Sequence, residues 1–496
     1  NMETLQRTAN RGSISTGNYE IDNSLKFEAD NTEIIYRTNE SGTNRKTFTT
    51  SLWFKRTELG ATQEVWHGGR NGELVGIGII TYSGFADQLW IDIGGGSGNT
   101  GTLYRSASNQ KIRDTSAWYH VCLAVDTTQG TEANRMKVWL NGVEVTSWEQ
   151  HQIPAQNYQG ALESGTEMAW GGYRPSNSEI FSGYLAECHY LDGVAKVQTD
   201  FGEYDEDSGI WKPKAYTGTY GNNGCYMKYD DSSALGADSS GNGNTFTLNN
   251  IAASDQAVDT PTNSFATVST AMFVSHDLGY STTSDGGTLF RVTEFDTWVT
   301  AVSSIGVTKG KWYAEFKVIG ARNNTMWGIA SMEQLDGNSG YATGNGSHIG
   351  QADKNWGIGY YQANGRLYVV NNAGSSNTLS WGSAVSQNAV VSVALDMDNH
   401  KLYMALNNTY QNSGNPTSGA TGTGAISIDA TETVAIATSG YSLGSGNDTI
   451  AGVNFGGYVT GGMYSQATDG NGYGAFRYAP PTGYYALCTK NLAEFG

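Results

Sequence analysis

The chain has 496 residues and a formal net charge of −18, which opposes binding to the phosphate backbone of nucleic acid and to anionic membrane surfaces. One hydrophobic core rarely serves more than about 250 to 300 residues, so a single small module is excluded. No apolar run reaches the roughly 18 residues that a membrane-spanning helix needs, so we expect neither membrane insertion nor a nucleic-acid partner.

Turn residues and short apolar runs indicate an all-β chain. Glycine accounts for 65 of the 496 residues, about 13% against a usual share of ~7%, whereas there are only 7 prolines. Glycine supplies the positive φ angles of tight turns, and proline is excluded from the interior of a sheet. The apolar runs are short, rich in β-branched and aromatic residues, and bounded by Gly, Asn, Asp and Ser. Antiparallel sheets are therefore predicted.

Three segments alternate apolar and polar residues on both sides of a turn pair, which is typical of a hairpin. They are residues 137–145 around Asn141-Gly142, residues 356–371 around Asn364-Gly365, and residues 390–406 around Asp398-Asn399.

A polar stretch poor in large apolar side chains predicts a linker at residues 251–265. Domains are accordingly expected at residues 19–250 and 266–496. Residues 408–424 form a second low-complexity stretch, but strand-like residues resume after it, so we expect a long loop inside the second domain. Residues 1–18 form a polar N-terminal segment that could attach the chain to a larger assembly.

Metal-ligand spacing is absent among the cysteines, Cys122, Cys188, Cys225 and Cys488, which are expected to be free thiols in the core. No cofactor is expected. Calcium stays open, because Asp238, Asn242 and Asn244 offer oxygen ligands, although a turn rich in Asx residues explains the same pattern.

Two literal enzyme motifs lack the structural context that their chemistry needs. They are GxGxxG at Gly96, Gly98 and Gly101, and GxSxG at Gly440, Ser442 and Gly444. Each requires a helix directly after the glycine turn, either to hold a pyrophosphate or to form a nucleophile elbow. No helical period follows either motif, so loops are predicted. His120 and His189 lie inside apolar strands and are expected to be core polar groups.

Two sets of segments resemble known families of antiparallel β-sandwiches. In the first half, residues 51–56 (SLWFKR), 117–128, 134–145 and 183–193 (GYLAECHYLDG) are similar to a laminin-G or concanavalin A-like lectin domain. In the second half, residues 309–318 (KGKWYAEFKV), 326–331, 355–361, 391–408 and 452–456 resemble a SPRY domain. The resemblance implies two β-sandwich, jelly-roll-like domains in tandem.

The pairing of these two domains resembles a bacteriophage architecture found in tail fibres and other virion appendages. The segments that carry this further resemblance are residues 200–224, 234–251, 259–267 and 483–492. It implies a non-enzymatic virion surface protein that recognises a host surface glycan or protein, contacts other virion structural proteins and forms a homo-oligomer. No heptad run supplies a coiled-coil stalk.

Aromatic residues among glycines mark the expected contact surface. Tyr458, Tyr464, Tyr473 and the nearby Tyr478 stand among small polar residues, a composition similar to antibody binding loops, and Trp381 is a second candidate. The same rings could instead pack on the sandwich as a lid, as a subunit contact or as core.

Two alternatives to an adhesin remain. A capsid-decorating or assembly protein would use the same aromatic loops for protein contacts and bind no glycan. A glycoside hydrolase would use Glu203, Asp205 and Asp207, which alternate as the paired carboxylates of lectin-like glucanases do, although a solvated acidic loop is the favoured interpretation of these residues.

Overall fold

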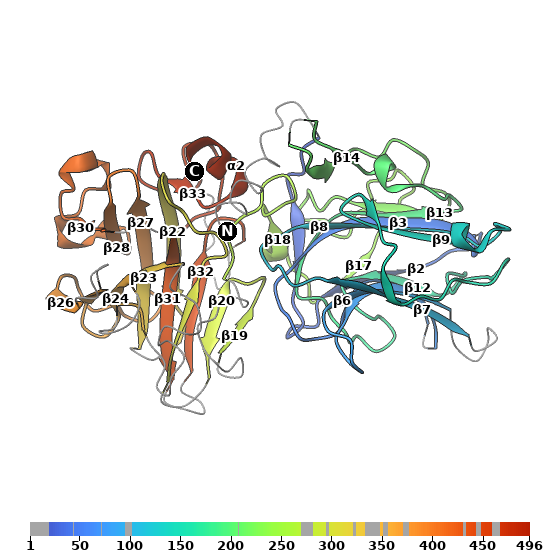
Figure 1. Ribbon diagram of the computed structural model, residues 1–496, viewed down its shortest axis with the longest axis horizontal. Helices are drawn as coiled ribbons and strands as arrows, with labels where there is room; N and C mark the ends of the chain where they lie inside the picture. The colour runs from blue at the N-terminus through green and yellow to red at the C-terminus, as the bar shows by residue number, and fades with distance from the viewer. Residues whose placement is uncertain are drawn as a thin grey trace. The chain divides into compact units, whose positions relative to one another are not determined.

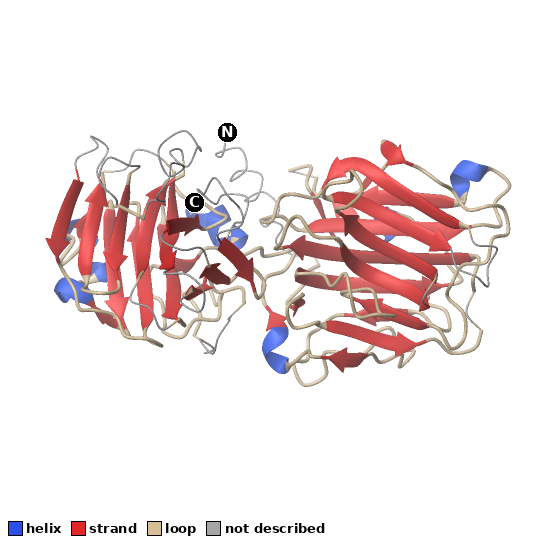
Figure 2. Cartoon of the chain, turned by 90° about the horizontal axis from the view of Figure 1, so that it is seen from below, coloured by secondary structure: helices blue, strands red, loops and turns tan. Residues whose placement is uncertain are grey.

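The computed structural model describes residues 19–496 except for positions 43, 71, 95–101, 207, 269–280, 294–296, 321–323, 333–347, 351–355, 371–375, 430–432, 443–447 and 459–466. The described residues form two compact units, residues 19–262 and residues 263–496. Strands make up most of the regular secondary structure of both units, as Figure 2 shows. The predicted all-β fold of tandem antiparallel β-sandwiches is confirmed.

The first unit is a sandwich of two sheets, which lie one above the other in Figure 1. One sheet has the order β10 (Val143–Glu144), β9 (Met136–Leu140), β8 (Tyr119–Asp126), β3 (Thr47–Arg56), β13 (Gly183–Asp192), β1 (Ser24–Phe27) and β18 (Gln256–Ala257), with β16 (Cys225–Met227) paired to β13. The facing sheet has the order β11 (Trp148–Gln150), β7 (Leu103–Lys111), β6 (Gln88–Gly94), β5 (Glu73–Ile80), β4 (Gln63–Arg70), β12 (Glu167–Trp170), β2 (Ile34–Thr38) and β17 (Thr247–Asn249). A separate hairpin joins β14 (Gly202–Tyr204) to β15 (Trp211–Pro213).

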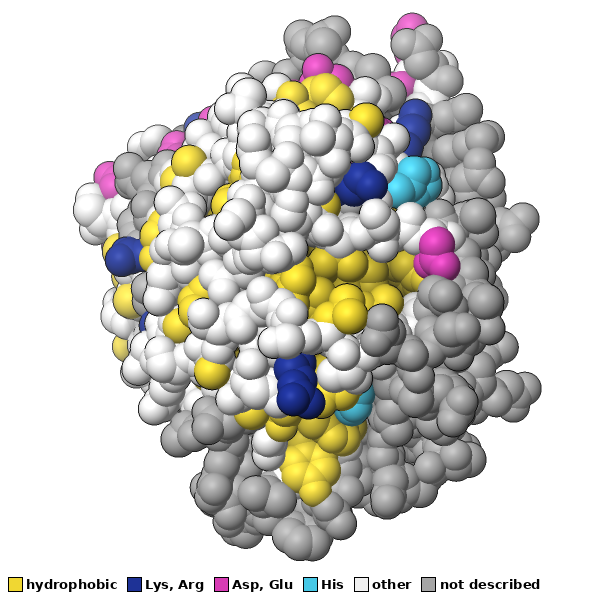
Figure 3. Space-filling model, turned by 90° about the vertical axis from the view of Figure 1, so that its left-hand side faces the viewer, with side chains coloured by type: hydrophobic (Ala, Val, Ile, Leu, Met, Phe, Trp, Pro, Cys, Tyr) yellow, Lys and Arg dark blue, Asp and Glu magenta, His cyan; other side chains and the backbone are white. Residues whose placement is uncertain are grey.

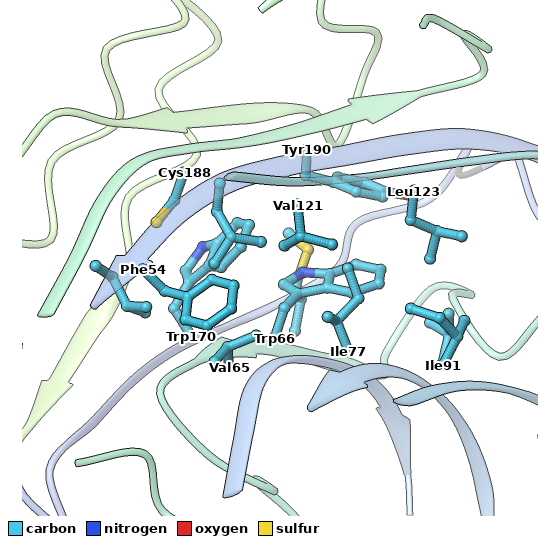
Figure 4. Packing of buried hydrophobic residues seen from close by; sticks show 14 of the residues in the cluster. Phe54, Val65, Trp66, Ile77, Ile91, Val121, Leu123, Trp170, Cys188 and Tyr190 are labelled. Carbon is cyan, nitrogen blue, oxygen red and sulfur yellow. The ribbon is translucent and has the colours of Figure 1, made fainter. Parts of the chain in front are cut away.

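The core of the first unit lies between these sheets. Trp66 on β4 stacks against Tyr190 of the opposite sheet with ring centroids 5.8 Å apart, and its centroid lies 6.2 Å from that of Trp170. All three rings are buried, and Figure 4 shows them among Phe54, Val121, Ile77 and other apolar side chains. Large aromatic rings of this kind dominate the burial of apolar surface in such cores.

The second unit is also a two-layered sandwich. One sheet has the order β19 (Ser281–Ser284), β20 (Leu289–Val292), β32 (Thr449–Asn454), β22 (Lys311–Val318), β27 (Val390–Asp396), β28 (Lys401–Leu406) and β29 (Thr409–Tyr410), with β30 (Ile426–Ser427) on β28 and β33 (Tyr485–Ala486) parallel to β22. The other has the order β21 (Thr297–Val302), β31 (Val434–Ser442), β23 (Thr325–Ser331), β24 (Gly357–Tyr361), β25 (Arg366–Val370) and β26 (Ser376–Ser380). Trp312 and Trp327 are buried between them.

Helices are short throughout the described part of the chain. The α-helix α2 (Thr489–Phe495) ends the chain, and 3₁₀ turns occupy Glu132–Asn134, Gln198–Asp200, Ala253–Asp255, Gln411–Ser413 and Pro416–Thr421. The helices in this part of the chain include none that is both long and apolar enough to cross a bilayer.

The three predicted hairpins are confirmed. β9 pairs with β10, β24 with β25, and β27 with β28, all antiparallel. Asn141 and Gly142 have φ angles of 49° and 80°, as the predicted turn requires. The four cysteines are free and buried, as expected.

The structure folds most of the expected linker into the first unit. Within residues 251–265, strand β18 pairs with β1. The boundary between the two units along the chain falls between Thr262 and Asn263. The buried carboxylate of Asp259 holds this segment, because it accepts hydrogen bonds from Lys55 Nζ at 2.7 Å and Trp118 Nε1 at 2.8 Å. The polar residues of this segment therefore belong to a hydrogen-bonded part of the first unit and not to a linker. The N-terminal segment, residues 1–18, lies outside the described residues.

Candidate ligand-binding site

The aromatic residues predicted to bind a ligand do not form one exposed surface in the second unit. Tyr458 is only 7% exposed and donates its hydroxyl proton to Asp285 across 2.9 Å. Trp381 is half-buried against the core, edge-on to Tyr360 at 5.5 Å. Tyr473 is half-buried, and Lys490 Nζ lies 5.5 Å from its ring centroid. Tyr464 lies outside the described residues. These placements match the alternative in which the rings pack on the sandwich.

Buried carboxylates fasten the glycine-rich segment of residues 467–478 to the sandwich. Glu315 on β22 accepts the backbone N–H groups of Arg477 and Tyr478, each at 2.7 Å, and the Tyr313 hydroxyl at 3.0 Å. Asp469, inside the segment, joins it to strand β33, because it accepts the backbone N–H groups of Tyr473 and Ala486, each at 2.9 Å. Bonds to a charged acceptor are stronger than neutral ones, so this segment is held in a single arrangement.

A different cluster stands out in the first unit, on the outward face of the sheet that contains β4 to β7. Side chains alternate between the two faces of a strand, so β6 buries Leu89, Ile91 and Ile93 in the core and turns Trp90 and Asp92 outward. On β5 the outward positions beside them are Gly76 and Gly78. Because these two positions have no side chain, side chains from the neighbouring strands can pack against the backbone of β5.

The four residues Tyr82, Trp90, Asp92 and Arg105 form what we call the Arg105 cluster. Arg105 on β7 donates from Nε to Asp92 Oδ1 at 2.7 Å and from Nη2 to Asp92 Oδ2 at 2.5 Å. Its Cζ lies 4.5 Å from the ring centroid of Trp90, and its Nη1 donates to the Tyr82 hydroxyl. Two parallel bonds, a cation–π contact and a third bond therefore fix this guanidinium.

The Arg105 cluster is partly open to solvent. Tyr82 is 45% exposed, and the Arg105 side chain is 20% exposed. Tyr82 stands at a tight turn, in which Phe85 N–H donates to Tyr82 C=O at 3.0 Å and Gly84 has a φ of 95°. The hydrogen bond to Asp92 raises the pKa of Arg105, and burial raises that of Asp92 against the opposing bond from Arg105. An exposed aromatic face beside fixed polar groups is the arrangement that a sugar ring needs.

Glu64 and His67 lie beside this cluster and are buried. A β-bulge in β4 turns both Val65 and Trp66 into the core, so Glu64 and His67 face outward. Glu64 Oε2 lies 3.5 Å from His67 Nδ1, and neither side chain has a hydrogen-bond partner among the described residues.

Burial sets the charge state of this pair. It raises the pKa of Glu64, as do the carboxylates of Glu179 and Asp92, and it lowers the pKa of His67 to about 3. Both shifts favour the neutral form of the group concerned, which makes its burial tolerable. Perturbed acid and base groups gather at functional sites more often than elsewhere, so they support this face as the candidate site.

The alternation of residues on strands β5 and β6 is a sequence signal for this face, separate from the motifs described above. Outward positions 88, 90 and 92 of QLWIDIG read Gln, Trp, Asp, and outward positions 76 and 78 of ELVGIGII are both Gly. Alternation therefore placed Trp90 and Asp92 on one face beside a flat strip. Arg105 and Tyr82 could not be added, because their approach depends on the β6–β7 register and on a turn.

The histidines expected in the core are there, and the geometry at His120 opposes catalysis. An indole N–H can only donate, so the 3.0 Å contact from Trp211 Nε1 makes Nδ1 of His120 an acceptor. The proton of this neutral ring is then on Nε2, which donates to Ser51 Oγ at 2.8 Å. A base that activates serine needs the opposite direction. His189 pairs with the Tyr220 hydroxyl at 3.0 Å.

The carboxylates considered for glycoside hydrolysis lie on the separate β14–β15 hairpin and its turn. Glu203 is on β14 with Lys212 3.6 Å away, and bonds from Ser208 lower the pKa of Asp205 to about 2. A hydrolase of this kind needs one carboxyl whose pKa is raised, so that it can donate a proton. Asp205 shows the reverse, and Asp207 lies outside the described residues.

The other motifs are structural where they are described. Ser442 is buried at the end of strand β31, whereas Gly444 and the glycines of GxGxxG lie outside the described residues. Asp238 accepts backbone N–H bonds from Tyr226, Ser240 and Asn244, and Arg37 holds the Asn244 oxygen. This loop is a turn rich in Asx residues. Across the described part of the chain, no three His, Cys, Asp or Glu are placed to share a metal ion.

Comparison with known proteins supports the fold of the first unit. Residues 30–198 match the family model described as the concanavalin A-like lectin/glucanases superfamily. The match covers about a third of the chain and lies within the first unit, whose two-sheet sandwich is thus similar to the concanavalin A-like lectin/glucanase fold. A search of curated proteins finds no match.

Solved structures give weaker likenesses. The SPRY domain of human HERC1 is 13% identical, with coverage of 38% of this chain and 96% of that domain and a TM-score of 0.27. A human SPRY domain is 9% identical, with coverage of 35% and 94% and a TM-score of 0.23. A heptameric SAP-like pentraxin from Limulus polyphemus is 14% identical, with coverage of 35% and 78% and a TM-score of 0.26. TM-scores this low do not establish a relationship.

Proposed function

We propose that the chain is a saccharide-binding adhesin and that its first unit contacts the ligand through the Arg105 cluster. The observation that carries this proposal is the exposed ring of Tyr82 beside a guanidinium fixed by Asp92 and Trp90. Sugar rings present C–H faces that stack on aromatic rings, and their hydroxyls need positioned polar partners. The matching family model, whose description includes lectins, supports the same function.

We further propose that the adhesin is displayed on a virion surface, as a tail fibre or similar appendage. The support is the resemblance of the segments at residues 200–224, 234–251 and 483–492 to phage appendage proteins, together with the SPRY-like segments of the second half. The partners would be a host surface glycan or protein and other virion proteins. Homo-oligomeric display would raise the effective affinity of a shallow site through multiple contacts.

A glycan array tests the saccharide-binding function. The full chain, displayed multivalently, should bind a subset of host surface glycans, and Tyr82→Ala should lose most of this binding. Tyr204→Ala is the matched control, because Tyr204 is 47% exposed in the same unit but lies on β14. If neither host glycans nor host cells retain the protein at micromolar concentration, or if Tyr82→Ala binds like the unmodified chain, the proposal fails.

An assembly role is the second candidate, and an apolar area on the second unit favours it. Figure 3 shows apolar side chains gathered at the centre of the face that lies on the left in Figure 1. At this end of the sandwich Leu379 on β26 is 38% exposed, and Val369 and Trp381 are half-buried. Such an area suits a protein contact. Leu379→Lys should then reduce incorporation into particles and leave glycan binding unchanged.

A further inference from the structure

The hydrogen-bonding capacity of the Arg105 cluster defines the chemistry of its ligand. Arg105 has five N–H donors, of which the described bonds use three, two to Asp92 and one to the Tyr82 hydroxyl. Both Asp92 oxygens already accept a bond from Arg105. Tyr82 accepts through its oxygen, so its own O–H proton can still donate to a ligand. The four residues of the cluster therefore offer donors and no unoccupied carboxylate of their own, although Glu179 brings a carboxylate near enough for Arg105 to lower its pKa against the effect of burial.

The accessible side of the cluster carries these donors. Tyr82 is 45% exposed and Arg105 20%, whereas Asp92 and Trp90 are buried beneath them. A ligand that approaches from solvent meets the Tyr82 ring and the outer edge of the guanidinium first. We infer that this site takes a carboxylate-bearing sugar residue, whose carboxylate accepts from Arg105 and Tyr82 while its ring stacks on Tyr82. This inference rests on the proposed saccharide-binding function.

The net negative charge of the chain opposes binding of an acidic sugar, whereas the rigidity of the Arg105 guanidinium favours it. The net charge of −18 repels an acidic sugar at long range, but salt screens exposed charges over about 8 Å at physiological ionic strength. Contacts inside the cluster are shorter than this. The guanidinium is already fixed by Asp92 and Trp90, so a ligand loses little affinity in ordering it. A planar fork also matches a carboxylate better than a lysine ammonium does.

The probe is an array on which each acidic oligosaccharide, terminated by a uronic acid or another carboxylate-bearing sugar, is printed beside its carboxyl-reduced form. The full chain should bind acidic members and lose about tenfold or more on reduction of the carboxyl, as expected for charge-assisted bonds. Arg105→Lys, which keeps the charge but not the fork, should lose a similar factor. Tyr82→Phe keeps the exposed ring and should lose about threefold to tenfold.

Two controls separate binding from folding. Arg113→Lys changes an arginine whose side chain is 54% exposed and pairs with Asp87, outside the cluster, so it should bind normally. Tyr82→Phe removes one hydroxyl from an exposed side chain, so its unfolding midpoint should match that of the unmodified chain even if Arg105→Lys is destabilised. Equal binding of reduced and acidic forms, or normal binding by Tyr82→Phe, overturns the inference but leaves saccharide binding intact. Failure of every saccharide overturns both.

Discussion

The indole N–H of Trp211 donates to Nδ1 of His120 across 3.0 Å, between side chains that are both buried. Burial, and secondarily the electrostatic effect of His189, lowers the pKa of His120 to about 3. His120 therefore remains neutral throughout the physiological range and holds the β14–β15 hairpin against the sheet. It has no accessible role as a proton carrier.

We predict that His120 makes the protein less stable as the pH falls. The unfolded chain takes up a proton below the ordinary histidine pKa of 6.5, whereas the folded chain does so only near pH 3. The free energy of unfolding should thus fall between pH 6.5 and pH 3 by up to about 1.4 kcal/mol per pH unit for this residue. Urea unfolding at pH 7, 6 and 5 should show a smaller decline for His120→Gln than for the unmodified chain. If the unfolding free energy of both proteins declines equally with pH, His120 does not have the lowered pKa described here.

Glu64 should have the opposite pH dependence. Its pKa is raised by burial and by the carboxylates of Glu179 and Asp92, so the folded chain keeps the proton above pH 4.5 while the unfolded chain releases it. Stability is therefore full below pH 4.5 and is lost as the pH rises toward the folded pKa. Glu64→Gln should become more stable relative to the unmodified chain as the pH rises above 4.5, by an amount on the order of 1 kcal/mol. Glu144→Gln, at a side chain that is 43% exposed, should gain none.

Gly142 is required for both its backbone angle and its space. Its φ is +80°, and a Cβ there would lie 2.3 Å from Trp211 Cε3. Gly165 has nearly the same angle, +81°, but a Cβ there would meet nothing within 4 Å. Gly165→Ala should cost about 1 kcal/mol of unfolding free energy from backbone strain alone, and Gly142→Ala about 2 to 4 kcal/mol. If both variants lose the same unfolding free energy in denaturant titrations, the Trp211 side chain can move away from a Cβ at position 142 without cost.

Removal of calcium should leave the Asp238 loop unaffected. Both carboxylate oxygens of Asp238 accept hydrogen bonds from within the loop and from Tyr226 N–H. A ligand that binds only the folded state raises the melting temperature. Because the Asp238 oxygens already accept these hydrogen bonds, we expect no calcium binding here, and calcium added after EDTA treatment should change Tm by less than about 1 °C. A rise of several degrees that disappears in Asp238→Asn would instead assign a calcium site to this loop.

Local sequence features predicted the strands and turns well, because they depend on neighbours in the chain. Asn141-Gly142 predicted a hairpin through its φ angles, and the alternation of apolar and polar residues at 356–371 and 390–406 predicted two more. The segment at residues 251–262 was harder to predict. Its hydrogen bonds come from Lys55 and Trp118, which are far away in the sequence.

The binding residues were less predictable than the fold. Tyr458 and Tyr473 looked exposed because glycines surround them, yet Tyr458 donates to Asp285, and Asp469 accepts from both Tyr473 N–H and Ala486 N–H. Trp90 and Asp92 could be read from alternation. The position of Arg105 opposite Asp92 depends on the register between β6 and β7, and the residue pattern of one strand does not determine its register with another.

Hydrogen exchange mass spectrometry of the full chain, with and without an oligosaccharide retained on the array, tests the central claim most directly. Saccharide binding at the Arg105 cluster should slow exchange in the peptides that contain Tyr82 to Asp92 and Leu103 to Lys111, and the saccharide should be recovered intact afterwards. Protection confined to the second unit, or recovery of a shortened saccharide, would contradict it.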